Sequence, residues 1–459
     1  MVNDKDSRLS EAVVLERTAS VAHTSRRFST HVALTLATRI FMLASSLATS
    51  VVVARWLGAG GLGTLAVLNV IVALAVQIGC AGLPSANTYF ISQDPSKAGV
   101  IWSNAVLFSL VTGGLLAGLV IVLAQSYSGM LGNVPLQLIT IAALSIPFQL
   151  LTLLGNNVFL STGRIDRFNQ IDAATQFVLV FNAVVALIVM GLGLASLVIF
   201  NSVSAAILSL VVVLLIYISI KRLNASQSQV DVGLFTQMMR YAIRFHISAV
   251  AALIIFRSDL LIVNHYRGAK EAGAYAVASQ MANLMVLLPA IIGTLLFPRV
   301  ASMPDPRGGM TTRATRHTAF IMLIACLAAV PCSFLLPLVY GSDFRDATIQ
   351  LLILLPGVYF FGIESVMVQH FSGTGLPPAI PIFWVIALIV NLSLNLLLIP
   401  SYGALAAATT STLSYTLIFI LVAVYFRSKT GNSLTSALLL QKEELRELSD
   451  PIRLILFSR

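Results

Sequence analysis

The sequence has little charge: Asp, Glu, Lys and Arg together make up 10% of its 459 residues, against about a quarter in a typical soluble domain. It also has few cysteines. Cys80, Cys326 and Cys332 all lie in apolar runs without the spacing of metal ligands, which argues against a disulfide framework and predicts no metal site. A Gly-rich loop ending in Lys-Ser or Lys-Thr is also missing, so the sequence predicts no nucleotide cofactor.

Apolar residues take the place of the missing charge. They make up 58% of the chain, and the mean hydropathy is +0.92. A transmembrane helix needs about 20 consecutive, mainly apolar residues, and the sequence contains about twelve such runs. It therefore predicts an all-α polytopic membrane protein. The runs lie near 32–54, 64–91, 99–125, 135–160, 168–191, 196–219, 245–265, 273–298, 315–340, 347–371, 378–399 and 404–426.

The chain repeats itself at an offset of about 210 residues. Residues 57–67 (LGAGGLGTLAV) are echoed by 267–277 (RGAKEAGAYAV), and Pro147 and Pro356 match in nearly the same register. Each copy holds six of the apolar runs, and an even number of crossings returns the chain to its starting side. Both copies therefore cross the membrane in the same sense. This pattern predicts two six-helix lobes related by a pseudo-two-fold axis along the membrane normal, with a substrate site between them.

These features predict four regions. Residues 1–31 form a polar N-terminal segment, 32–222 the N-lobe, 223–427 the C-lobe and 428–459 a C-terminal tail. The N-terminal segment is too long for the charged lead of a signal peptide, so no cleaved presequence is expected. In the tail, 434–448 has apolar and charged residues at helical spacing, which is typical of an amphipathic helix on a membrane surface, although a loosely ordered tail fits as well.

The basic residues predict the orientation. Most lie in the terminal segments and in connections on the N-terminal side, whereas the opposite side holds only Arg55, Arg267, Lys270 and Arg345. Because cytoplasmic loops carry the excess of Lys and Arg, both termini are expected in the cytoplasm. The net charge of +10 is explained by this topology and by contact with anionic lipid headgroups. The basic residues are scattered over many loops and are not gathered on one face, so the sequence predicts no nucleic-acid partner.

Four segments combine glycine turns with apolar spans in a fixed order: 54–63 (ARWLGAGGLG), 257–262 (RSDLLI) with 268–275 (GAKEAGAY), 340–344 (YGSDF) with 354–357 (LLPG), and 391–404 (NLSLNLLLIPSYGA). In order and spacing they resemble the Wzx-type polysaccharide flippases. These belong to the multidrug/oligosaccharidyl-lipid/polysaccharide exporter (MOP) superfamily, together with multidrug extruders and lipid II flippases. The resemblance runs from about Arg39 to Phe426.

The resemblance implies a MATE-like fold that moves an undecaprenyl-diphosphate-linked oligosaccharide across the bacterial inner membrane by alternating access. The product would be a lipopolysaccharide, an exopolysaccharide or another cell-surface polysaccharide, and the partners a polysaccharide polymerase and export machinery. The protein would then be a transporter and not an enzyme.

Charged side chains inside spans cost at least about 2.5–3.5 kcal/mol and usually face a cavity. Arg39 and Arg257 lie in the first predicted span of each lobe. Since guanidinium groups suit phosphate geometry, both are predicted to bind the diphosphate. Two alternatives stay open. Arg39 lies near enough to the cytoplasmic interface for its side chain to extend into it. Asp259 forms an ion pair with an arginine, either Arg257, from which it points away because the two residues are only two positions apart on a helix, or an arginine of another helix.

Two carboxylates are candidates for coupling to H⁺ or Na⁺. Glu364 is predicted in an apolar setting in span ten, where a carboxylate can exchange a proton or hold a cation, and Asp259 is the second candidate. The alternatives are a Glu364 satisfied by a polar neighbour and an Asp259 that neutralises an arginine. Pro147 and Pro356 are predicted to kink spans four and ten, either as hinges or as static bends.

Amide side chains are predicted either to bind sugar hydroxyls in a wet cavity or to join helices by hydrogen bonds. They are Asn87, Asn104, Asn156, Asn157, Gln176, Asn182, Asn201, Gln280, Asn283, Gln369, Asn391 and Asn395.

Three other functions compete with the oligosaccharide-lipid flippase. A multidrug or cation antiporter would favour acidic and aromatic cavity residues, whereas the two arginines favour an anionic substrate. A lipid II flippase is expected to carry two further C-terminal spans. A membrane-embedded glycan polymerase would need a sizeable outer loop with acid and base groups, and the outer connections here are short.

Overall fold

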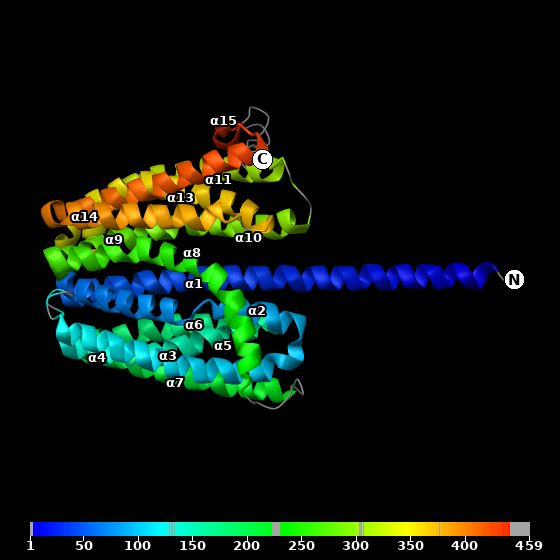
Figure 1. The fold of residues 1–459 in the computed structure, drawn as a ribbon, viewed down its shortest axis with the longest axis horizontal. Coiled ribbons are helices and arrows are strands. Elements are labelled where there is room, and N and C mark those ends of the chain that lie inside the picture. Colours follow the sequence, from blue (N-terminus) through cyan, green and yellow to red (C-terminus); the bar gives the residue numbers. More distant parts are fainter. Residues whose placement is uncertain are drawn as a thin grey trace, which may run out of the picture.

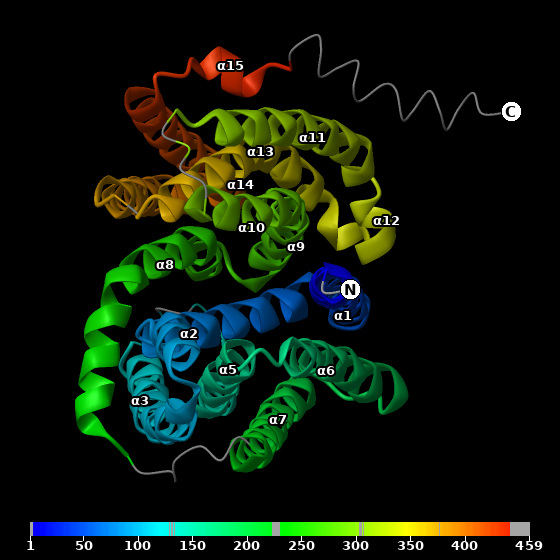
Figure 2. The same ribbon diagram turned by 90° about the vertical axis from the view of Figure 1, so that its right-hand side faces the viewer.

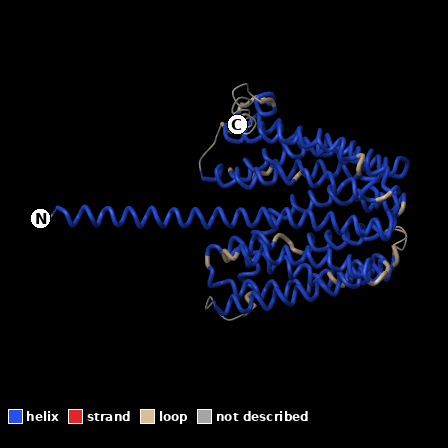
Figure 3. Tube along the Cα trace, turned by 180° about the vertical axis from the view of Figure 1, so that it is seen from behind, coloured by secondary structure: helices blue, strands red, loops and turns tan. Residues whose placement is uncertain are grey.

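The computed structural model describes the backbone of residues 3–440 except 128, 130–131, 133, 223–229, 303–304, 306 and 376. Every regular element in this part of the chain is a helix (Figure 3). Figure 3 also shows the first helix continuing beyond the bundle, so the predicted N-terminal segment prolongs the first span. The predicted amphipathic segment 434–448 is described only up to residue 440, where its first part forms α15 (Leu434–Leu438).

The first half of the chain contains nine helical elements among the described residues. They are α1 (Asn3–Gly79), α2 (Leu83–Gln93), η1 (Pro95–Lys97), α3 (Ala98–Ser126), α4 (Leu136–Ala143), α5 (Ile146–Ser161), α6 (Ile165–Ala183), η2 (Val184–Val189) and α7 (Leu194–Arg222). The second half contains α8 (Val232–Arg267), α9 (Ala269–Met285), α10 (Leu287–Ser302), α11 (Gly309–Ser333), α12 (Leu336–Tyr340), η3 (Ser342–Phe344), α13 (Arg345–Gly373), α14 (Ala379–Thr430) and α15.

Ten helices of the described chain are long and apolar enough to cross a membrane. Two of these, α1 and α14, are each divided by a glycine in a non-helical conformation, Gly58 (φ 69°, ψ −175°) and Gly403 (φ 63°, ψ −143°). Figure 1 shows α1 and α14 each running to one end of the bundle and turning back. The glycine divides each helix into two arms of more than 20 residues within the apolar spans. The architecture is therefore consistent with about twelve crossings and confirms an all-α polytopic fold.

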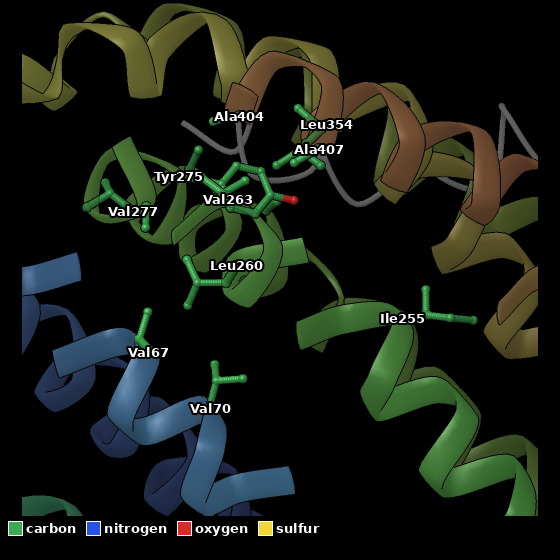
Figure 4. Packing of buried hydrophobic residues seen from close by; sticks show 14 of the residues in the cluster. Val67, Val70, Ile255, Leu260, Val263, Tyr275, Val277, Leu354, Ala404 and Ala407 are labelled. Atoms are coloured by element: carbon green, nitrogen blue, oxygen red, sulfur yellow. The ribbon is translucent and has the colours of Figure 1, made fainter. Parts of the chain in front are cut away.

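The two halves of the chain form two helix groups. In Figure 2, α2–α7 lie in one group and α9–α15 in the other, with α1 and α8 between them. The larger hydrophobic core joins both arms of α1 to α8, α9, α13 and α14. Figure 4 shows part of it: Val67 and Val70 of α1 face Leu260 of α8, and Tyr275 of α9 lies beside Ala407 of α14.

The first turns of α8 pack on the N-lobe. The Asn104 side-chain amide bonds the backbone of Asp231 in both directions, with Nδ2 to O at 3.0 Å and N to Oδ1 at 3.1 Å. Tyr241 stacks on Tyr89 with ring centroids 4.5 Å apart. The apolar candidate span begins only at Ala249, so α8 holds the N-lobe with its first part and enters the C-lobe with its second (Figure 2).

The sequence repeat reappears as a symmetric contact between α1 and α9. A Cβ on Gly63 would overlap the carbonyl oxygen of Ala269, and a Cβ on Gly273 would overlap that of Ala59. Both glycines and both alanines are related by the offset of 210 residues. The two helices therefore approach backbone to backbone, as small residues permit in membrane proteins.

Polar contacts reinforce this end of the bundle, which we call the closed end. The Arg55 guanidinium on α1 donates to the carbonyls of Val339, at 2.8 Å from Nε, and Leu338. Ser50 Oγ donates to the Tyr340 hydroxyl at 3.1 Å. Arg55 and Ser50 lie in the first half of the chain and their partners in the second, so the two lobes are joined here.

Replacement of Gly63 by alanine tests the closed end. The added methyl group meets the Ala269 carbonyl, and we expect overpacking of about 1–3 kcal/mol to separate the lobes at this end. Spin labels on the exposed Leu136 of the N-lobe and Leu335 of the C-lobe should report a longer distance by double electron–electron resonance. Gly60→Ala is the matched control, because a Cβ at Gly60 would meet no atom within 4 Å. Equal distances in both variants would contradict the proposed contact.

Candidate functional site

A cavity of about 490 Å³ lies between the lobes beneath the closed end. Both arms of α1 line it, together with α6, α8 and α9. Its polar lining residues come from both halves of the chain: Ser46, Thr49, Ser50, Asn69, Gln176, Arg257, Asp259, Ser279, Gln280 and Asn283. We call it the central cavity.

Arg257 is the one cationic side chain that lines the central cavity among the described residues. It is exposed to this space, and no described carboxylate lies within ion-pair distance of its guanidinium. Asp259 lines the same cavity but is only 2% exposed, and no ion pair joins it to Arg257. Arg257 can therefore offer its donors to an anion.

Asp259 is held by neutral donors. Its carboxylate accepts hydrogen bonds from the Tyr275 hydroxyl of α9, from Ser411 Oγ of α14 at 3.1 Å and from the Leu260 amide at 2.7 Å. Tyr275 and Ser411 are themselves buried. The expected alternative, an ion pair with an arginine, is not observed among the described residues.

A second buried polar group adjoins Asp259 through Ser411. Asn391 Nδ2 donates to Ser414 Oγ at 3.1 Å, Asn395 Nδ2 donates to Asn391 Oδ1 at 3.0 Å, and the Thr410 hydroxyl donates to Asn395. These residues come from the two arms of α14 on either side of Gly403. The predicted amides Asn391 and Asn395 thus join helices, whereas Tyr275 and the hydroxyls of 410–414 were not anticipated from the sequence.

Glu364 does not line the central cavity. It is on α13 and 1% exposed, and its Oε1 has no hydrogen-bond partner among the described residues. An unpaired buried carboxyl oxygen is costly, so this site carries an unsatisfied acceptor. Asp259 therefore accepts hydrogen bonds from neutral donors, whereas Glu364 Oε1 accepts none from the described residues.

The structure does not bring Arg39 and Arg257 to one place. Arg39 Nη1 lies 3.2 Å from Asp172 Oδ2, and its guanidinium lies over the Phe168 ring at 5.7 Å. Asn156 Nδ2 donates to the other oxygen of Asp172 at 2.6 Å. Nothing in the sequence indicates this ion pair, because its partners lie far apart in the chain, on α1 and α6.

Asp172 lines a second cavity, of about 690 Å³, inside the first half of the chain. Helices α1, α4, α5, α6 and α7 surround this N-lobe cavity. Amides and hydroxyls make up its polar lining: Thr49, Asn69, Ser145, Gln149, Thr152, Asn156, Asn157, Thr175, Gln176, Asn201, Ser202 and Ser204. Gln149 and Asn69 were not among the amides singled out from the sequence.

The two matched prolines lie in different surroundings. Pro147 is in the first turn of α5, directly after the break that separates α4 from α5. Pro356 lies inside the continuous helix α13, where it removes one backbone hydrogen bond. Nearby carbonyls receive side-chain donors instead, Ile353 from Thr412 at 2.6 Å and Leu355 from Cys326 at 3.7 Å.

No group of three or more His, Cys, Asp or Glu side chains in the described chain is arranged to hold a metal ion. The chemistry that these residues offer is binding, by one cation, one buried carboxylate and many neutral amides and hydroxyls.

Solved structures share the fold of this chain. The fold is similar to that of the lipid II flippase MurJ in an inward closed conformation, with a TM-score of 0.71, 15% identity and 92% of each chain covered. It is also similar to an inward-facing multidrug resistance MATE family transporter of the MOP superfamily, with a TM-score of 0.66 and 13% identity over 85% of this chain and 94% of that chain. The expected MATE-like fold is therefore confirmed.

Sequence relatives point to glycan export. The succinoglycan biosynthesis transport protein ExoT of Rhizobium meliloti (strain 1021) is 26% identical over 296 residues, which cover 63% of this chain and 55% of ExoT. The probable low-salt glycan biosynthesis flippase Agl15 of Haloferax volcanii is 22% identical over 190 residues, 40% of each chain. The chain thus spans about half or less of the length of these curated relatives.

Residues 52–349 match the family described as polysaccharide biosynthesis protein. This stretch includes Gly63 and Gly273 of the closed end, Arg257 and Asp259 of the central cavity, and most of the lining of both cavities. This match covers more than half of the chain and shows that the chain belongs to the polysaccharide biosynthesis protein family.

Proposed function

We propose that this protein is a flippase that carries a polyprenyl-diphosphate-linked oligosaccharide across the bacterial inner membrane for the synthesis of a cell-surface or extracellular polysaccharide. The observation that carries the proposal is the unpaired Arg257 in a cavity between two lobes that are joined at one end. A diphosphate headgroup needs a cationic partner within the membrane, and the planar guanidinium presents several donors to it. The names of the glycan flippase and transport relatives support the substrate class.

The orientation follows from the distribution of positive charge. With both termini in the cytoplasm, the closed end faces the outside and the central cavity is accessible from the cytoplasmic side. This is the state that would load a substrate made in the cytoplasmic leaflet. Release on the other side requires the contacts of Gly63, Gly273 and Arg55 to open. Pro356 and the break before Pro147 are the proposed hinges of this movement.

A gradient of H⁺ or Na⁺ is the proposed energy source, and Asp259 the residue that senses it. Asp259 lines the central cavity and at the same time bonds α9 and α14. A change in its charge therefore alters contacts between helices that have to move. Glu364 has no such links among the described residues, so it is the weaker candidate for this role.

A multidrug or cation antiporter on the same fold is disfavoured by the central cavity. An unpaired arginine repels an organic cation, and Asp259 is already saturated with donors. Proteins that export the finished glycan, such as a polysaccharide polymerase and its export machinery, are the proposed partners.

Arg257→Gln tests the headgroup site. A charge-assisted contact contributes about 1.5–3 kcal/mol, so loss of the guanidinium should weaken binding of undecaprenyl diphosphate by tenfold or more. Complementation of a strain lacking this gene should fall in parallel, with lipid-linked repeat units accumulating in the cytoplasmic leaflet. Arg240→Gln, which removes an exposed arginine of the same helix outside the cavity, should bind and complement as the unchanged protein does. Full complementation by Arg257→Gln would overturn the headgroup assignment.

Asp259→Asn tests ion coupling. The amide keeps the size of the carboxylate and one acceptor oxygen, so the fold should persist while the charge is lost. In proteoliposomes, transport of a fluorescent polyprenyl-diphosphate sugar should no longer respond to an imposed H⁺ or Na⁺ gradient. Binding of the same lipid without a gradient should change less than threefold. Glu364→Gln is the companion variant, and retention of the gradient response in Asp259→Asn with its loss in Glu364→Gln would move the role to Glu364.

A further inference from the structure

The N-lobe cavity is larger than the central cavity, and the headgroup site does not account for it. We infer that it is a binding site for the uncharged sugar residues of the substrate, next to the diphosphate held at Arg257. This inference rests on the proposed flippase function and specifies which part of the ligand each cavity receives.

The two cavities adjoin each other. They share a wall made of Thr49, Leu65 and Asn69 of α1, and Gln176 and Leu179 of α6. A ligand with its anionic group at Arg257 therefore reaches the N-lobe cavity without crossing a lobe. Both volumes fall in the range of about 300–1,000 Å³ that is usual for small-ligand sites.

Free hydrogen-bonding groups lie at this junction. Asn69 is exposed to the cavities, and Gln176 is half-buried. Neither side chain makes a hydrogen bond to another described residue. Deeper in the N-lobe, Gln149 uses Nε2 on Ser145 Oγ at 2.9 Å and Asn157 uses Nδ2 on the Leu153 carbonyl at 2.8 Å, which leaves the oxygen of each amide as an acceptor. Amides with free donors and acceptors suit the hydroxyl groups of a sugar.

The repeat shows that three amides of this lining are confined to one lobe. At the offset of 209 that relates the prolines, Gln149 corresponds to Val358 and Asn157 to Val366; at 210, Gln176 corresponds to Ile386. Other polar lining residues keep polar counterparts: Asn156 has Ser365, Asn69 has Ser279, Asn201 has Ser411, Ser202 has Thr412 and Ser204 has Ser414. Pseudo-symmetric packing therefore does not require Gln149, Asn157 and Gln176, because the C-lobe packs with apolar residues at these three positions.

Aromatic rings occupy the corresponding region of the C-lobe. Phe361 contacts Phe256, Tyr415 and Trp384, with centroids 5.0, 5.5 and 6.1 Å apart. All but Phe256 are buried. One lobe thus encloses a polar cavity where its partner is filled, which is the arrangement expected when only one lobe receives a hydroxyl-rich ligand.

The charge of the N-lobe cavity indicates which sugars fit. Asp172 is the one ionisable side chain of its described lining that carries charge, and Arg39 neutralises it at 3.2 Å. A sugar carboxylate would find no unpaired cation here and would meet Asp172. The site therefore suits neutral hexoses and N-acetylhexosamines better than uronic acids.

Binding to the purified protein in nanodiscs tests the inference with three probes. They are undecaprenyl diphosphate alone, the same lipid with a neutral glucose–galactose disaccharide, and the same lipid with a terminal glucuronic acid. We expect the unchanged protein to bind the neutral glycolipid about tenfold more tightly than the sugar-free lipid, as one or two sugar hydrogen bonds would give. The glucuronic acid probe should lose most of this advantage.

The double variant Gln149→Leu/Asn157→Leu changes two amides that line the N-lobe cavity and not the central cavity. It should remove the preference for the neutral glycolipid and leave the affinity for the sugar-free lipid unchanged. Asn157→Leu alone gives the same test if the double variant does not fold. Ile386→Leu, the repeat counterpart of Gln176, is the control and should behave as the unchanged protein does.

The outcomes separate the two proposals. A preference for the neutral glycolipid that survives in the N-lobe variants, or is missing in the unchanged protein, overturns the sugar site while the headgroup site stands. If the unchanged protein binds none of the three probes, the proposed function itself fails. Arg257→Gln distinguishes the sites, since it should weaken all three probes by a similar factor.

Discussion

The contact of α1 with α9 at the closed end is the constraint on which the rest of the structure depends. In a bilayer, helices gain nothing by removing apolar surface from water, so close packing and hydrogen bonds have to hold them together. Gly63 and Gly273 supply the packing, since each admits the carbonyl of the other helix, and Arg55 supplies hydrogen bonds across the lobes. Because the contact is backbone to backbone, it is tight when formed and contains few side chains that must unpack when it opens. A transporter needs a joint of this kind, one that is strong in one state and easily separated in the other.

The same membrane explains why so few charges remain inside the bundle and why their surroundings differ. Arg257 is tolerated because it faces a cavity. Arg39 is paired with Asp172, and Asp259 accepts from a tyrosine, a serine and a backbone amide. Of the described lining of both cavities, only Arg257 presents a net charge without a partner. In the proposed function, the accessible guanidinium attracts an anionic headgroup, and hydrogen bonds from the neutral amides and hydroxyls distinguish the group attached to it.

Much of the fold could be predicted from the sequence, because its signals are periodic or local. Apolar runs indicated the spans, and the glycines near 58 and 268 indicated the repeat, which the structure explains by their positive φ angles of 69° and 84°. The candidate functional site was harder to predict from the sequence. Arg257 and Asp259 were found because charge inside a span is rare, yet their partners could not be. Asp172 lies at the entry of a predicted span, and Tyr275 and Ser411 are ordinary residues of apolar helices. Pairing between helices depends on tertiary packing, which has no periodic signature. The matched prolines show this limit, because equal positions in the repeat lie at a helix start in one lobe and inside a helix in the other.

Symmetry and asymmetry therefore serve different parts of the mechanism. Where the lobes must close against each other, the repeat is retained, with alanine carbonyls opposite glycines on both sides. In the region of the proposed cargo it is partly abandoned: Gln149, Asn157 and Gln176 line the N-lobe cavity, and rings of Phe361, Tyr415 and Trp384 fill the C-lobe. In the proposed mechanism, the filled lobe and the hollow lobe move about one symmetric joint. The hollow lobe can then vary with the glycan while the joint stays the same, because the residues of the N-lobe cavity wall and those of the closed end are separate. The joint meets the central cavity at Ser50, which lines that cavity and also donates to Tyr340.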